Sequence, residues 1–185
     1  SDFLFGEVFE FLCELCFHSD MAYIVISPGS RNAPLINAFT RRFGNRCISL
    51  IDERSAGYFA LGLARHSRKP VVLICTSGTA VLNYTPSLAE AYYQRIPLLA
   101  LTADRPAEWI DQQDNQTIRQ ADVYRNFVKH SLNLPEEVDT DEQLKAVHRQ
   151  IKSALGMLGT GSPGPVHINV PLREPLYNEL PQPLE

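Results

Sequence analysis

Three charged residues in a row, Asp52, Glu53 and Arg54, follow a short apolar run that ends at Ile51. The run predicts a buried strand over residues 47–51, with a helix directly after Arg54. Ligands of open α/β sheets bind beyond the carboxyl ends of the strands. A carboxyl group shielded from water there has a raised pKa and can share a proton with a weak base. We therefore predict that Glu53 does chemistry; the alternative is that it only favours the helix N-terminus or pairs with an arginine.

Polar residues also follow three other predicted strands. Because parallel strands end at one edge of a sheet, these clusters should lie near Glu53. No histidine has a spacing that ties it to a serine, and no metal-ligand spacing is present, which argues against a nucleophilic triad and a metal centre. The three clusters are Ser27–Arg31, Thr76–Thr79 and Thr102–Arg105.

Two short motifs do not indicate function. Gly159, Gly161 and Gly164 match G-x-G-x-x-G, but they follow a predicted helix and precede a predicted strand. The dinucleotide fingerprint requires the opposite order, so these glycines are expected to end a helix and form a turn. Cys13 and Cys16 lie late in an apolar helical pattern without a second Cys/His pair, which predicts core thiols.

Helical and strand patterns alternate along the chain. Unbroken apolar strands are typical of parallel sheets that are covered on both faces. This predicts an α/β fold, a doubly wound parallel sheet with helices on both faces, and a long polar loop over residues 108–121. The expected helices are 3–18, 34–43, one following Arg54, 80–94 and 140–158; the expected strands are 23–26, 47–51, one following Pro70, 97–101, 127–134 and 166–170.

Small residues recur on one face of the helix after Arg54. Ala56, Ala60 and Ala64 are four residues apart, and Gly57 lies beside them. Such a flat face predicts close contact with another element. The periodicity leaves open whether that element belongs to the same domain or to another subunit.

Composition sets broad limits on the kind of protein. The 185 residues suit one α/β domain, expected over residues 1–175, with the start of a linker to further domains over residues 176–185. A net charge of −4 disfavours nucleic acid as a partner, so an anionic ligand requires local arginines. We find no apolar stretch long enough for a membrane span and no signal-peptide pattern, and we predict a cytoplasmic protein.

Five motifs in order resemble the amino-terminal, pyrimidine-binding domain of thiamine-diphosphate enzymes. Among these enzymes they are most similar to the 2-succinyl-5-enolpyruvyl-6-hydroxy-3-cyclohexene-1-carboxylate synthases of menaquinone biosynthesis. The resemblance extends from about Phe9 to Tyr177. The motifs are SPGSR (27–31), DERSAG-x-x-ALGLA (52–64), TSGTA-x-x-N (76–83), LTADRP (101–106) and NQ-x-IRQ (115–120).

The resemblance implies a role for Glu53. In the family, the corresponding glutamate bonds N1′ of the cofactor's aminopyrimidine and so promotes loss of the proton from thiazolium C2. Pro28, Thr79 and Asn83 match positions that line the pyrimidine pocket. Thr79 stands where many relatives have proline, and its hydroxyl can bond the cofactor or cap a helix.

The resemblance also implies substrate-side residues. Ser30, Arg31 and Arg105 match positions that face isochorismate and 2-oxoglutarate, whose carboxylates suit arginine forks. Asn115 and Gln116 are expected near the reacting centre. Like Glu53, Gln116 is expected to be a catalytic residue. Arg119 either assists there or is an ordinary surface arginine.

The family's diphosphate site, with Mg²⁺ or Mn²⁺, uses a GDG motif and a later asparagine, and the chain contains no GDG. We therefore expect a fragment, inactive alone, of a protein about three times longer that forms a homodimer or homotetramer. The implied reaction adds the succinic semialdehyde unit of 2-oxoglutarate, with decarboxylation, to isochorismate. Two alternatives stay open: another thiamine-diphosphate carboligase or decarboxylase, similar to acetolactate synthase, and a non-catalytic α/β assembly module.

Overall fold

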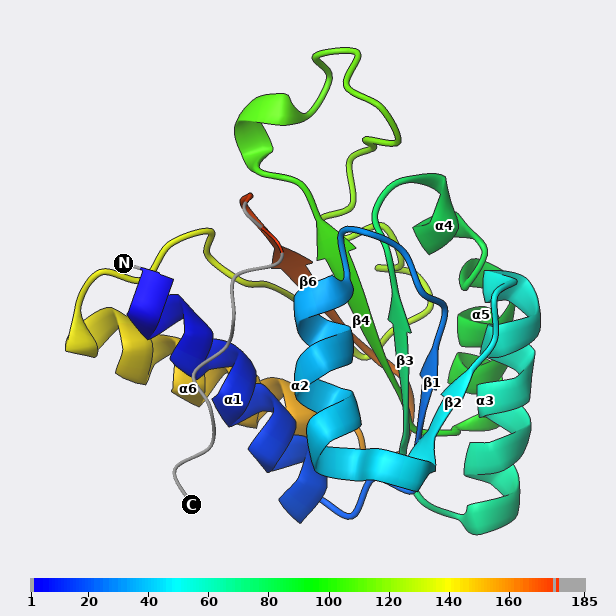
Figure 1. Ribbon diagram of the computed structural model, residues 1–185. Helices are drawn as coiled ribbons and strands as arrows, with labels where there is room; N and C mark the ends of the chain where they lie inside the picture. The colour runs from blue at the N-terminus through cyan, green and yellow to red at the C-terminus, as the bar shows by residue number, and fades with distance from the viewer. Residues whose placement is uncertain (1, 175, 177–185) are drawn as a thin grey trace.

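The computed structural model describes residues 2–174 and 176, and in these the strands form one parallel sheet (Figure 1). The strand order is β2-β1-β3-β4-β6-β5, and every neighbouring pair is parallel. The predicted parallel sheet is therefore confirmed. The strands are β1 (Tyr23–Ile26), β2 (Cys47–Ser49), β3 (Val71–Cys75), β4 (Leu98–Asp104), β5 (His130–Asn133) and β6 (Val166–Pro171).

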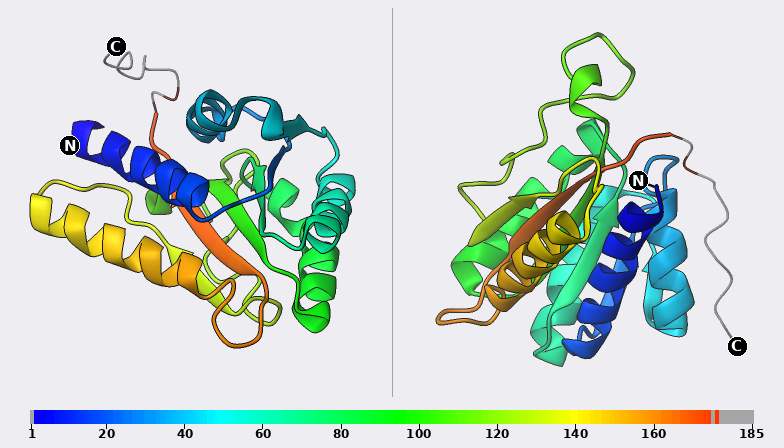
Figure 2. Two further views of the ribbon diagram at one scale, coloured as in Figure 1. Left: turned by 90° about the horizontal axis from the view of Figure 1, so that it is seen from below. Right: turned by 90° about the vertical axis from the view of Figure 1, so that its left-hand side faces the viewer.

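Helices cover both faces of the sheet, as a doubly wound fold requires (Figures 1 and 2). One apolar cluster joins the sheet to α1 (Asp2–His18), α2 (Ala33–Phe43) and α6 (Asp141–Gly156). The other joins the opposite face to α3 (Glu53–Ser67) and α5 (Thr85–Gln94), beside the short helix α4 (Thr79–Leu82). Single 3₁₀ turns lie at Gly44–Arg46 and Ala107–Trp109.

Local sequence explains these elements. All residues of β3 and β4 are buried, in agreement with the unbroken apolar run of β3 and of the first four residues of β4. Helix α6 begins with a complete capping box, in which the Thr140 hydroxyl and the Gln143 side chain each accept a backbone N–H of the other. The first turn of α2 contains Pro34, whose missing N–H costs nothing there.

The small-residue face of α3 packs inside the domain. Ala56, Gly57, Ala60 and Ala64 are all buried. A Cβ on Gly57 would overlap the Ser87 hydroxyl of α5, so the two helices can approach this closely only because residue 57 is glycine. Of the two alternatives for this face, the structure shows contact within the domain.

Four predicted elements were wrong in their extent. The strand expected over residues 97–101 continues to Asp104, so Thr102 and Asp104 are buried within β4. The strand expected over residues 47–51 ends at Ser49; it is a half-buried edge strand, and Ile51 is 84% exposed. The helix expected over 80–94 is split into α4 and α5, because Pro86 lacks an N–H and cannot donate to the carbonyl oxygen four residues before it. The strand expected over 127–134 covers only β5, an edge strand with a single neighbour.

The two rejected motifs behave as predicted. Gly159, Gly161 and Gly164 lie in the connection between α6 and β6, and Gly161 has a left-handed φ of +69°. Cys13 and Cys16 are buried free thiols, and burial raises the pKa of both.

Within the described residues, no helix is both long and apolar enough to cross a membrane. The predicted linker lies outside the described residues except for Leu176.

Candidate active site at the carboxyl edge of the sheet

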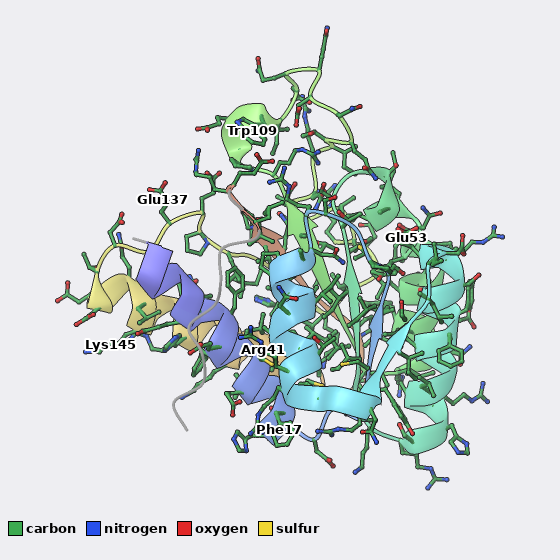
Figure 3. The ribbon with its side chains drawn as sticks, in the orientation of Figure 1. Phe17, Arg41, Glu53, Trp109, Glu137 and Lys145 are labelled. Atoms are coloured by element: carbon green, nitrogen blue, oxygen red, sulfur yellow. The ribbon has the colours of Figure 1, made fainter. Side chains whose placement is uncertain are left out.

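Four polar clusters gather at the carboxyl edge of the sheet. Three of them follow β1, β2 and β3, and the fourth, Thr102–Arg105, forms the last residues of β4 and the residue after it; the four strands are neighbours in the sheet and run in the same direction. Figure 3 shows Glu53 at the start of α3 and Trp109 in the loop after β4, both at this edge. The expected meeting of the clusters is therefore confirmed.

Glu53 is the first residue of α3. The preceding Asp52 is the N-cap: its carboxylate accepts the Ser55 backbone N–H at 2.7 Å, and that bond lowers its pKa. The Glu53 side chain is half-buried, and no donor among the described residues bonds to its carboxyl group. Burial raises the pKa of the Cys75 thiol at the end of β3, and the charge of Glu53 adds to that shift. The free carboxyl group therefore lies within electrostatic reach of the end of β3.

The three residues expected to line the pyrimidine pocket are all exposed. Pro28 follows β1, while Thr79 begins α4 and Asn83 follows its last residue. The Asn83 side-chain amide donates to the Thr79 carbonyl oxygen at 3.2 Å, so α4 holds these two residues together. They lie open on the same edge of the sheet as Glu53.

Gly78 is the point where the loop after β4 meets the turn after β3. Its φ is +79°, a conformation that side chains disfavour. A Cβ on Gly78 would also overlap the backbone carbonyl of Gln116. Glycine is therefore required twice at this position, for the turn and for the close approach of Gln116.

Arg105 joins the two turns electrostatically. Its Nη1 donates to the Ser77 hydroxyl at 2.5 Å and to the Gln116 carbonyl oxygen at 3.1 Å. Its Nε lies 2.7 Å from a carboxylate oxygen of Asp114. The guanidinium group thus holds the loop against the end of β3 while it stays partly exposed.

Arg31 is the more buried of the two site arginines. Its side chain is 6% exposed, and it donates to the Leu172 carbonyl oxygen at 3.0 Å and to Glu174 at 3.1 Å. Its Nε has no hydrogen-bond acceptor among the described residues. Burial lowers the pKa of Arg31, and the positive charge of Arg105 adds to this. The structure therefore brings two arginines near each other, and one retains a donor without a partner.

The other expected substrate-side residues lie on the surface of the site. Ser30, Asn115 and Gln116 are exposed, and Gln116 has a left-handed φ of +57°. Arg119 is 80% exposed and pairs with Asp111 at 2.7 Å. Of the two alternatives for Arg119, this geometry favours the ordinary surface arginine.

Sequence reasoning missed a buried polar network behind the site. Its centre is Asn169 of β6, which uses all four of its side-chain hydrogen-bonding positions. Its amide nitrogen donates to Asp104 at 2.8 Å and to Asn133 at 2.7 Å. Its oxygen accepts from Thr102 at 2.7 Å and from Gln120 at 3.0 Å. Burial raises the pKa of Asp104, and the bond from Asn169 opposes that shift.

His167 extends this network away from the edge of the sheet. It is fully buried, and burial lowers its pKa to about 3, so the ring is neutral near pH 7. The single Thr102 proton goes to Asn169, so the Thr102 hydroxyl must accept from His167 Nε2 at 2.7 Å. Nδ1 then accepts from Ser131 at 3.3 Å. His167 is therefore a core histidine whose two ring nitrogens are both hydrogen-bonded.

A sequence signal for the network exists in the strand register. Polar residues alternate with apolar ones at the ends of β4, β5 and β6, and Thr102 and Asn133 are both paired in register with Asn169. Three neighbouring strands with polar residues in the same alternation indicate a shared polar layer. One strand alone does not show this.

The sequence matches a known protein family and, within it, individual curated relatives. Residues 7–123 match the family described as thiamine pyrophosphate enzyme, N-terminal TPP binding domain, and the chain belongs to this family. Thiamine pyrophosphate and thiamine diphosphate are the same cofactor, so the predicted class is confirmed.

Eight curated relatives carry the name 2-succinyl-5-enolpyruvyl-6-hydroxy-3-cyclohexene-1-carboxylate synthase. The chain is 52% identical to the synthase of Desulfotalea psychrophila over 90% of its own length and 31% of that protein. It is 49% identical to that of Bacteroides thetaiotaomicron, over 83% of this chain and 28% of the relative. It is 52% identical to that of Porphyromonas gingivalis, over 83% and 27%. The chain thus spans about 30% of the length of the relatives it matches.

The residues at the edge fit part of a thiamine-diphosphate site. An aminopyrimidine needs a carboxyl group that is free to bond a ring nitrogen, and the Glu53 carboxyl has no donor among the described residues. Among the described residues, no group of three or more acidic, histidine or cysteine side chains is placed to hold a metal ion. The free Glu53 carboxyl group fits the pyrimidine half of the cofactor.

Proposed function

We propose that this chain is the pyrimidine-binding domain of a thiamine-diphosphate-dependent synthase. The full-length enzyme decarboxylates 2-oxoglutarate and adds the resulting succinic semialdehyde unit to isochorismate, as part of menaquinone biosynthesis. The relatives' shared name supports the reaction. The single observation that carries the role of this domain is the free, half-buried Glu53 carboxyl at the start of α3.

Glu53 acts on a proton at the pyrimidine ring. When bound, the cofactor supplies a nucleophilic carbon that bonds the 2-oxo acid and takes up the electrons left by loss of CO₂. The Glu53 carboxyl holds a proton at ring nitrogen N1′ and thereby keeps the pyrimidine in its active tautomer. A second domain that covers the edge of the sheet excludes water, so that solvent does not compete for the proton shared by the carboxyl group and N1′. Pro28, Thr79 and Asn83 position the ring.

Arg31 and Arg105 bind the carboxylates of the substrates. Their guanidinium groups now pair with Glu174 and Asp114 of the chain itself. A substrate carboxylate offers the same pair of oxygens and replaces these internal partners, with Ser30 and Asn115 as neutral donors. Gln116, which adjoins Asn115, positions the reacting carbonyl.

Other parts of the enzyme complete the site. We propose that a domain outside this chain binds the diphosphate through Mg²⁺ or Mn²⁺, and that the enzyme is a cytoplasmic homo-oligomer. Half a site loses most of its cofactor affinity, so the 185-residue chain alone is inactive. Synthase turnover by the purified chain would contradict this.

The decisive experiment compares two neighbouring carboxylates in the full-length enzyme. Glu53→Gln should lower kcat by about 10²–10⁴-fold, because an amide cannot hold the proton at N1′. Asp52→Asn is the matched control: asparagine also caps helices, so kcat should stay within about twofold. Near-normal kcat for folded Glu53→Gln would overturn the proposed role.

Assays of the full-length wild-type protein separate the two remaining alternatives from the proposed synthase. The synthase turns over 2-oxoglutarate with isochorismate. If the full-length wild type forms acetolactate from pyruvate instead, the protein is another carboligase of this family. If it turns over neither substrate pair yet folds and assembles, the chain belongs to a non-catalytic module.

A further inference from the structure

Gln120 connects the turn after β3, the end of β4 and the loop that carries Gln116. Its side chain is completely buried although it lies in an irregular polar loop. Buried amides are costly unless every polar group is bonded, so its partners are informative. Neither the family match nor the motif comparison gives it a role.

The Gln120 amide makes three hydrogen bonds to three different segments. Its oxygen accepts the backbone N–H of Gly78 at 2.7 Å. Its nitrogen donates to the Ala103 carbonyl oxygen at 3.0 Å and to Asn169 Oδ1 at 3.0 Å. The donor and acceptor sides of the amide thus have distinct partners, and only an amide of this length satisfies all three.

These bonds fix the backbone on both halves of the proposed site. Gly78 directly precedes Thr79, on the cofactor side, and Ala103 lies two residues before Arg105, on the substrate side. Between them the Gln116 carbonyl oxygen lies against Gly78 and accepts from Arg105. Gln120 is four residues after Gln116, so the same amide also holds the end of the loop.

We infer that Gln120 is a positioning residue that keeps Gln116 and Arg105 in register with the turn before Thr79. This rests on the proposed function, because it assigns Gln120 a task in that synthase site. Gln120 does not touch the reacting atoms in this role. Its loss lets the loop separate from the turn, and the reacting groups then spend less time in productive geometry.

The test uses the full-length enzyme and two substitutions. Gln120→Met keeps the length of the side chain and removes all three bonds; we expect kcat to fall at least tenfold. Gln120→Glu keeps the acceptor for Gly78 but places a carboxylate oxygen against the Ala103 and Asn169 oxygens, so we expect a loss at least as large as in the methionine variant. Gln143→Met is the matched control, since it removes the side-chain bonds of the α6 capping box, which contains none of the partners of Gln120. It should lower the unfolding temperature with kcat unchanged.

Amide hydrogen exchange of the substrate-free enzyme gives a readout independent of turnover. Gln120→Met should speed exchange several-fold in peptides covering residues 76–82 and 113–121, whereas Gln143→Met should leave both unchanged. Unchanged exchange there, or a kcat loss no larger than in Gln143→Met, would overturn the inference. A wild-type enzyme without synthase activity would instead refute the proposed function, while the exchange result would still test the bonds of Gln120.

Discussion

The two halves of the carboxyl edge differ in how completely their polar groups are bonded. On the β2–α3 side, Glu53 has no donor among the described residues, and Ile51 beside it is 84% exposed. On the β4–β6 side, Asn169 has four side-chain partners. Arg105 donates both to Ser77 in the turn after β3 and to Gln116 in the loop after β4. One half is left open; in the other, which we call the saturated half, the central Asn169 side chain has every hydrogen-bonding position filled.

This difference indicates which half needs another domain. A partner that covers Ile51 removes apolar surface from water, and a bound ring nitrogen would give the Glu53 carboxyl group the hydrogen-bond partner that it lacks among the described residues. The saturated half gains nothing from a cover and instead provides a rigid frame. We therefore expect substitutions on the saturated half to change the protein's own order, and those on the open half to change chemistry alone.

Gly78→Ala should cause the largest effect on the saturated half. Alanine at a φ of +79° costs about 1–3 kcal/mol, and its Cβ would push the Gln116 carbonyl away. We expect the full-length enzyme to lose at least 100-fold in kcat/KM. The control is Gly159→Ala, where an added Cβ meets nothing within 4 Å. Equal kinetics in the two variants would show that contact between the loop and the turn does not matter.

Arg105→Lys should have the next largest effect. A lysine cannot bond Ser77 and Gln116 together while it also faces a carboxylate, so we expect KM for the substrates to rise about tenfold, with a smaller change in kcat. The matched control is Arg65→Lys, since Arg65 makes only an exposed contact with Gln94 at 3.5 Å. A KM within twofold of wild type for Arg105→Lys would remove Arg105 from the substrate side.

Sequence alone predicted the open half better than the saturated half. Glu53 comes where an apolar run meets a helical pattern, and local pattern is enough to place it. Gln120 lies in a polar loop without periodicity, so nothing local marks it as buried. Its importance depends on Gly78 and Asn169, which are 42 and 49 residues away along the chain.

Errors in the predicted fold have the same origin. The split between α4 and α5 follows from Pro86, a local signal that the helical pattern obscured. The exposure of Ile51 depends on β2 being an edge strand, which only the strand order shows. Strand order depends on contacts distant in sequence, and a single sequence does not specify them.

The buried, neutral His167 should have a smaller effect, which is on the pH dependence of protein stability. Its pKa is about 3 in the folded protein against an ordinary value of 6.5, so below about pH 6.5 the unfolded chain binds a proton that the folded chain does not. The free energy of unfolding should therefore decrease as the pH is lowered, by up to about 1.4 kcal/mol per pH unit between about pH 6.5 and 3. The measurement is urea unfolding from pH 7.5 to 5.5, in wild type and His167→Gln, so that contributions of other groups cancel. Parallel pH dependences would contradict a neutral buried His167.

Arg119→Ala should have the smallest effect. An exposed ion pair contributes about 0–1 kcal/mol, so the unfolding temperature and KM should stay close to those of the wild type. A fivefold rise in KM would contradict this and place Arg119 in the substrate site.

Exchange of the cofactor's thiazolium C2 proton for deuterium tests the central claim most directly. The measurement uses full-length wild-type and Glu53→Gln enzymes loaded with thiamine diphosphate, without substrates. If Glu53 controls the proton at N1′, the substitution should slow exchange at least 100-fold, while the cofactor stays bound. Exchange at the wild-type rate in a cofactor-loaded Glu53→Gln enzyme would contradict the assignment of Glu53 as the proton-holding acid.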